Sequence, residues 1–457
     1  MAVISIIEKF PVELRQGLLA ALSDVSSLRS AVLSCSSLYH AFLGAEELIT
    51  TQVVENQLGS DVLPEAVAAL KSSRLQPWTR QGVVDFVDHH LHSRMSPLDS
   101  WTLSEALPLG NLHSSVERFA SEFIAEMLNV SSEFAYIDAP PGWPVSRQEM
   151  NRVQRAFYRF EVYCNLFRNP RVFEASEIGD LFFFKWSHWE NEQLACVHDY
   201  LFRAVCPGMN VPDPCRDSEL TPIAFNDLAE HDILWGELSV NAIDVIEYGD
   251  DFDSPAIQHL LSRGLVCLRQ IVDADSYEAR HRLLYRPYPD SNWDFLYEAL
   301  MSEAHRSNDD LYLSDYTQED EAKLARDHAP FVHDPDNGPA DAWRWAHQDE
   351  TRCGFVYSTY QTALRARGYC MWDRARLDEW SVFQQPWEPP DNPHRGDQQT
   401  SHKAEMQMSW RRRSEIHLRG GEGWWSVADE SKVVWPGGKN PFDVPLRKKR
   451  SWGLKYG

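Results

Sequence analysis

Apolar residues recur at three- and four-residue intervals from Val12 to about Trp380, and alternation of the kind found in β-strands is scarce. Because an α-helix has about 3.6 residues per turn, this spacing lines one face of each helix with apolar side chains. The pattern therefore predicts a mainly α-helical chain. Beyond residue 45 it predicts helices near residues 46–58, 64–72, 80–93, 114–128, 146–168, 190–205, 254–263, 265–273, 291–301 and 351–377.

Three short apolar stripes occupy the first 45 residues. Pro11 stands where a first-turn proline is tolerated, and Asp24 and Ser36 are suited to begin the second and third helices. Helices this short cannot bury their apolar faces individually, so we expect them to pack on one another or on a partner. The stripes consist of Leu14, Leu18 and Leu22, then Val25, Leu28, Val32 and Cys35, then Leu38 and Phe42.

The clearest helix start lies at Ser146, because Ser146 and Glu149 have the spacing of a capping box. Apolar residues then continue as a stripe to Phe167, which indicates a core helix. A neighbouring face of this helix carries three arginines. They could either bind phosphate or pair with the many acidic residues of the chain, and the abundance of acidic residues favours pairing. These arginines are Arg152, Arg155 and Arg159.

Composition divides the chain into three parts. A module over residues 1–45 leads into a large, irregular helical domain over residues 46–385, and residues 386–457 form a basic tail rich in Trp, Pro and Gly. A proline-rich run near residues 139–145 marks a candidate subdomain break, because prolines end helices. The acidic, turn-rich stretch over residues 302–350 is expected to be a loop with one helix within it.

The tail differs from an ordinary linker. Residues 386–457 hold seven prolines and eight glycines but also six tryptophans, and flexible linkers seldom carry so much aromatic surface. We therefore expect irregular chain that packs on the helical domain. A short hairpin is predicted near residues 415–427.

The formal net charge of −24 is unevenly distributed. Residues 403–457 carry 12 Lys and Arg against 6 Asp and Glu, so the preceding residues hold a balance of −30. An acidic body repels nucleic-acid phosphates, which makes nucleic-acid binding an unfavoured function. The basic run Arg447–Arg450 is open to two interpretations, a nuclear-localisation signal or a contact with the acidic body.

Neither a membrane span nor a secretory signal is expected. No stretch approaches the roughly 18 consecutive apolar residues of a spanning helix, and Glu8 and Lys9 come too early for a signal peptide. Eight cysteines are spread along the chain without a Cys-x-x-Cys pair, which is typical of reduced thiols. We expect a protein of the cytoplasm, the nucleus or both.

Two places in the chain carry residues of the kinds that bind metals. One is a cluster of His and Cys residues, but Cys196 and His198 are two apart in a predicted helix and point to opposite faces, so a core cysteine with a surface histidine is favoured over zinc. Asp334–Gly338 resembles a calcium loop in composition but lacks the EF-hand register. No familiar catalytic motif occurs. The sequence thus predicts no catalytic residue, no metal and no cofactor. The cluster of His and Cys residues considered for zinc consists of His188, Cys196, His198, Cys206 and Cys215.

The N-terminal module resembles the F-box. Phe10-Pro-Val-Glu-Leu14 reproduces the Leu-Pro-x-Glu-Leu opening of that motif, and spaced leucines and Cys35 follow in the expected order. Phe10 replaces the usual leucine, and Leu38 stands where many F-boxes carry a tryptophan. The alternative is that these residues are simply the first helices of an all-helical domain. Four further segments are similar to an uncharacterised group of filamentous-fungal F-box-like proteins: Ala45–Val54, Gln154–Glu161, Trp189–Cys196 and Arg365–Arg376.

The resemblance implies a non-enzymatic adaptor. F-box modules bind a Skp-family adaptor that links them to a cullin–RING (SCF) ubiquitin ligase, while another part of the chain recruits an unknown target protein. Two alternatives stay open, a scaffold that acts outside any ligase and an unrecognised enzyme in the helical body. By resemblance, the residues that meet the adaptor or brace those that do are Pro11, Leu14, Leu18, Leu22, Leu28, Val32 and Leu38.

Overall fold

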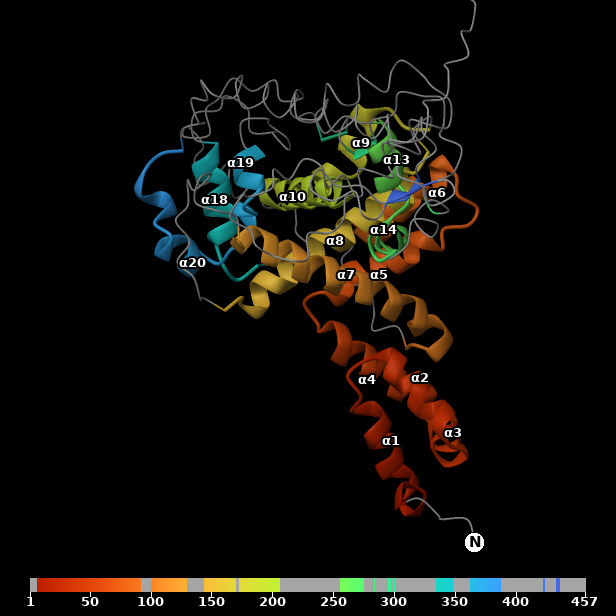
Figure 1. The fold of residues 1–457 in the computed structure, drawn as a ribbon. Coiled ribbons are helices and arrows are strands. Elements are labelled where there is room, and N and C mark those ends of the chain that lie inside the picture. Colours follow the sequence, from red (N-terminus) through yellow and green to blue (C-terminus); the bar gives the residue numbers. More distant parts are fainter. Residues whose placement is uncertain are drawn as a thin grey trace, which may run out of the picture. The chain divides into compact units, whose positions relative to one another are not determined.

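The computed structural model confirms a mainly α-helical chain (Figure 1). Among the residues that the structure describes, helices account for nearly all of the regular structure, and the one sheet there has two strands of two residues each. No helix among the described residues is long and apolar enough to cross a membrane. The structure describes residues 6–91, 100–129, 144–169, 172–205, 255–274, 283, 295–296, 299–300, 334–347, 362–387, 422–423 and 433–435.

The chain forms two compact units. The first consists of Met1–Tyr200, Gln258–Cys267 and Trp293–Pro389, and it holds the N-terminal helices together with the main core. The second consists of Leu201–Ile257, Leu268–Asn292 and Pro390–Gly457.

The first three helices follow the predicted stripes closely. After the 3-10 turn η1 (Ile6–Lys9), they are α1 (Val12–Ala20), α2 (Val25–Ser34) and α3 (Ser36–Leu43). Asp24 caps α2, since its carboxylate accepts a hydrogen bond of 2.7 Å from the backbone N–H of Ser27. The helices pack on one another through a small shared core of Leu19, Val25, Leu28, Val32, Leu38 and Phe42.

Four helices then extend this packing: α4 (Glu46–Leu58), α5 (Leu63–Ser73), α6 (Arg80–Phe86) and α7 (Leu103–Asn129), with the π-helical turn η2 (Val87–Leu91) after α6. Helix α7 is longer than the predicted 114–128. Its first turns contain Pro108 and Gly110, which disfavour helix in the sequence. Tertiary packing overrides this local preference, because a side chain at position 110 would contact Val25 of α2.

Helix α8 (Arg147–Phe167) is the central element of the first unit. The predicted capping box is confirmed, with Ser146 and Glu149 each accepting a hydrogen bond from the other's backbone N–H. Helices α5 and α7 pack against α8. Its aromatic residues join a larger cluster in which Phe157 meets Phe119, Phe123 and Tyr200.

The remaining helices are shorter, apart from α10. They are α9 (Ala175–Leu181), η4 (Phe183–Lys185), α10 (His188–Val205), α13 (Pro255–Leu261), α14 (Leu265–Val272), α18 (Gly338–Ala346), α19 (Thr362–Arg365), η8 (Tyr369–Met371), α20 (Arg374–Glu379) and η9 (Val382–Gln384).

Helix α18 corrects part of the sequence interpretation. It lies inside the stretch 302–350 that composition marked as an acidic loop, yet Trp343 and Trp345 are buried. Pro339 stands in the first turn, where its missing N–H costs nothing. Asp334 and Asp336, just before the helix, form ion pairs with Arg152. The helix predicted near residues 318–327 lies outside the described residues.

The tail is described only in part. Strands β1 (Glu422–Gly423) and β2 (Val433–Val434) pair antiparallel, so a short hairpin exists, but its second strand lies beyond the predicted 415–427. Trp387 is buried and its ring lies 5.7 Å from that of Trp345. The role of Arg447–Arg450 and the packing of most of the tail concern residues outside the described part, as do residues 139–143 of the predicted break.

Candidate functional site

Exposed apolar side chains gather on the N-terminal helices. Nine of the ten large hydrophobic residues that are exposed in the described part of the chain lie between Ile7 and Leu48. Scattered exposed leucines are normal on a protein surface, whereas a concentration of exposed apolar side chains is typical of interaction surfaces. These residues, which we call the N-terminal apolar face, are Ile7, Phe10, Val12, Leu14, Leu18, Leu33, Tyr39, Leu43 and Leu48.

The seven site residues predicted from the sequence fall into two groups. Pro11, Leu14 and Leu18 are exposed, and Leu14 and Leu18 keep 56% and 49% of their surface in solvent. Leu22 is half-buried. Leu28, Val32 and Leu38 are buried between the helices instead. The first group is available to a partner, whereas the buried group braces the helices that present it.

Long polar side chains fix how α1 lies against its neighbours. The guanidinium of Arg15 donates to the backbone carbonyl of Ser37, and the amide of Gln16 donates to the carbonyl of Ala41 at 3.0 Å. On the α4 side, Asn56 donates to the carbonyls of Ala20 and Leu22 at 2.9 and 3.0 Å. Ala20 and Ala41 lie in the last turns of α1 and α3, where helix carbonyls lack intrahelical partners, so these bonds hold the apolar face on a fixed frame.

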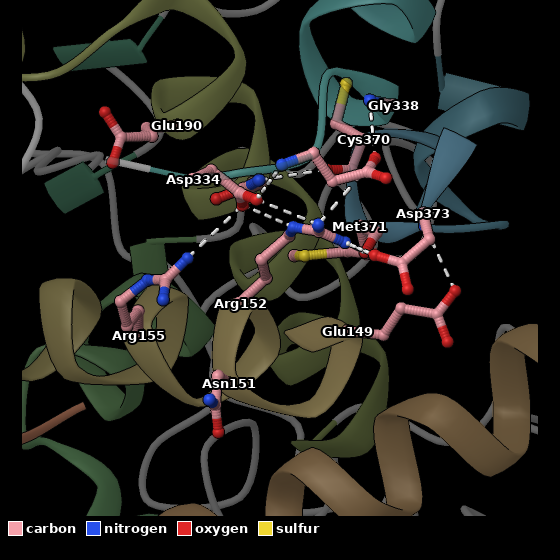
Figure 2. A network of polar contacts seen from close by, with 12 residues as sticks. Glu149, Asn151, Arg152, Arg155, Glu190, Asp334, Gly338, Cys370, Met371 and Asp373 are labelled. Atoms are coloured by element: carbon pink, nitrogen blue, oxygen red, sulfur yellow. Dashed lines mark hydrogen bonds and ion pairs between the residues drawn. The ribbon is translucent and has the colours of Figure 1, made fainter. Parts of the chain in front are cut away.

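A second candidate site is the arginine row of α8, whose three arginines are buried. Figure 2 shows Arg152 and Arg155 directed towards Asp334. Arg152 has no exposed surface and forms two contacts with the carboxylate of Asp334, one of them a hydrogen bond of 3.0 Å. Its Nη1 lies 2.7 Å from Asp373 and donates to the carbonyl of Met371 at 3.0 Å. Burial alone lowers the pKa of Arg152, but the two carboxylates outweigh it and leave that pKa raised.

The cap of α8 joins the same network. Arg376 makes a two-point contact with Glu149, both bonds measuring 2.7 Å, and its guanidinium lies near the rings of Trp372 and Trp380. Because Glu149 also accepts from the backbone N–H of Asp373, α8 is tied directly to η8 and α20. The prediction that the arginine row pairs with acidic residues is confirmed; its burial was not expected.

Arg155 and Arg159 continue the row towards α5 and α10. Arg159 donates to Glu190 at 2.6 Å and to Gln193 at 3.1 Å, and its guanidinium lies 4.8 Å from the ring centre of Trp186. Arg155 reaches Asp334 at 3.4 Å. Burial lowers the pKa of Arg159, although Glu190 opposes this. The residues of this row are committed to internal partners rather than open to a phosphate.

A third polar cluster lies around α10 and corrects the view of His198 as a surface residue. His198 is fully buried and contacts Asp199 at 3.0 Å and Gln258 at 2.8 Å. Asp199 in turn accepts from Arg365 at 2.8 Å. Cys196 is buried as expected. Within the described residues no group of His, Cys, Asp or Glu is arranged to hold a metal, and Cys206 and Cys215 lie outside them.

Sequence reasoning missed several residues of these sites. Leu33, Tyr39 and Leu43 join the apolar face from α2 and α3, and their exposure depends on which side of each helix turns inward. Glu65 is buried beside the arginine row, with no local signal to reveal it. No family model, no curated protein and no solved structure matches this chain.

Proposed function

We propose that this protein is an F-box-type adaptor whose α1–α3 module binds a Skp-family protein and thereby joins an SCF ubiquitin ligase. The observation that carries the proposal is the exposure of Leu14 and Leu18 on α1, at the places where the F-box resemblance expects partner contacts. A partner helix needs apolar anchors one turn apart, and residues 14 and 18 have that spacing.

The energetics of such a contact are sufficient for binding. Burying one leucine side chain contributes about 1.5–3 kcal/mol, so a few anchors decide an interface. Leu28, Val32 and Leu38 support this role from inside, because they hold the three helices together without a partner. No residue of the chain performs chemistry in this function; the transferring enzymes belong to the partners.

Co-purification with a Skp-family adaptor tests the proposal. We expect the wild-type chain to retain the adaptor and the double variant Leu14→Asp, Leu18→Asp to lose it while keeping its helix content. Val266→Asp is the matched control, since Val266 is an exposed apolar residue on α14, outside the module. It should retain the adaptor.

Two outcomes would contradict the proposal. A well-folded wild-type chain that recovers no adaptor would leave α1–α3 as structural helices and favour the scaffold alternative. Equal recovery with both variants would show that the adaptor binds elsewhere on the chain.

A further inference from the structure

Four buried polar atoms between α5 and α8 have no hydrogen-bond partner among the described residues. They are both carboxylate oxygens of Glu65, the Nε of Arg155 and the Nε of Arg159. All three side chains are at least nine-tenths buried. Leaving a buried donor or acceptor unsatisfied costs about 1–3 kcal/mol, so four such atoms in one place need a physical explanation.

The charges are close but do not bond directly. One oxygen of Glu65 lies 3.8 Å from Arg155 Nε and 3.7 Å from Arg159 Nη2, both beyond hydrogen-bond distance. Neither guanidinium can simply swing inward. Arg159 is held by Glu190 and Gln193 and stacks near Trp186, while Arg155 is drawn towards Asp334 on its other side.

We propose that Glu65, Arg155 and Arg159 form an internal water site between α5 and α8. A water molecule both donates and accepts, so it can donate to the Glu65 carboxylate while accepting from an arginine Nε–H. The Glu65 oxygen and Arg155 Nε, which are 3.8 Å apart, can each lie at hydrogen-bond distance from a molecule placed beside the line that joins them. One or two waters would satisfy all four atoms.

Other small occupants fit the same atoms less well. A metal cation would be repelled by the two guanidiniums. An anion would be repelled by Glu65 and by Asp334 and Glu190, which pair with the same arginines. A proton on Glu65 would leave a carbonyl oxygen as acceptor, but the Glu65 oxygen 3.8 Å from Arg155 Nε is too far away to accept directly. The site goes beyond the adaptor function, because it concerns how the first unit is held together rather than what it binds.

A crystal structure of the full chain that resolves ordered solvent tests the site directly. We expect a water peak about 2.7–3.2 Å from a Glu65 oxygen and from the Nε of Arg155 or Arg159. Direct hydrogen bonds between Glu65 and the arginines with no peak, or a dry gap, would overturn the proposal. This measurement needs no variant and is unaffected if a variant fails to fold.

Oxygen-17 relaxation dispersion tests the same site in solution by counting long-lived internal waters. Glu65→Met removes both carboxylate oxygens, whereas the matched Glu65→Gln keeps two polar atoms at the same reach. We expect the count to fall by at least one in the Met variant and to stay at the wild-type value in the Gln variant. An unchanged count in a folded Met variant would contradict the proposal.

Discussion

Leu14 and Leu18 on α1 leave about half of their surface in solvent, whereas Arg152 and Arg159 on α8 are buried completely. Each region departs from the usual placement of apolar and charged residues, but in opposite directions. The charges of α8 have partners within the chain, namely Asp334, Asp373 and Glu190. The leucines of α1 face solvent. The comparison teaches that the buried charges of α8 are accounted for by contacts within the chain, whereas the exposed leucines of α1 are not covered by any described part of it.

The largest effect is expected from Arg152→Met. The change keeps the length of the side chain but removes the cation that Asp334 and Asp373 share, leaving Asp334 only its 3.4 Å contact with Arg155. It should lower the free energy of unfolding by about 3–5 kcal/mol. Urea denaturation measures the loss. Arg118→Met is the control, because Arg118 pairs with Glu122 on the surface of α7 and should change stability by no more than about 0.5 kcal/mol. Equal effects would remove the distinction between the two kinds of charge.

The next largest effect separates a buried leucine from an exposed one within α1–α3. Leu28→Ala removes a fully buried side chain and should cost about 2–5 kcal/mol of unfolding free energy, because a cavity is left between α2 and its neighbours. Leu14→Ala removes a half-exposed one and should change stability by less than about 0.5 kcal/mol. Thermal and urea unfolding of both variants check this. A large loss in Leu14→Ala would mean that α1 uses this residue for folding rather than for binding.

These contrasts also show what the sequence could predict. The starts of α2 and α8 were predictable, because Asp24 with Ser27 and Ser146 with Glu149 are caps made by residues three apart. The burial of Arg152 was not, because Asp334 lies 182 residues further along the chain. The spacing of Leu14 and Leu28 indicated helix faces in both cases, but only packing decides which face turns inward.

Helix α18 shows the same limit at the level of an element. Asp334 and Asp336 gave its surroundings the composition of a solvent-exposed loop. In the structure these carboxylates bind Arg152 and cap the start of the helix, where Asp336 accepts from the backbone N–H of Gly338 at 2.7 Å. Composition counts charges, whereas the fold depends on whether each charge meets a partner.

Glu161 gives a pH test of the buried charges. It lies on α8, and burial raises the pKa of its carboxyl to about 7, although the backbone N–H of Leu265 donates to it. A carboxyl with a raised pKa holds its proton more tightly when folded, so its contribution to stability falls as pH rises from about 4.5 to about 7 and is constant above that. Glu161→Gln removes this titration. The unfolding free energy of the variant, relative to that of the wild type, should rise by at most about 3 kcal/mol between pH 5 and pH 8. Urea denaturation at each pH measures this difference. A difference independent of pH would show that Glu161 ionises at its ordinary pKa.

The smallest effect is expected from Gly17→Ala, which should stabilise the solvent-facing helix α1. Gly17 lies within α1, and a Cβ added there would meet nothing within 4 Å. Gly17→Ala should therefore raise the unfolding free energy by about 0.5–1 kcal/mol, because alanine loses less backbone entropy in a helix than glycine. Gly264→Ala should instead lower the unfolding free energy. Gly264 has φ +81°, and an added Cβ would lie 2.9 Å from both carboxylate oxygens of Glu161. Melting temperatures of the two variants separate the cases. If Gly17→Ala were instead destabilising, α1 would not be the open, solvent-facing helix that the apolar face requires.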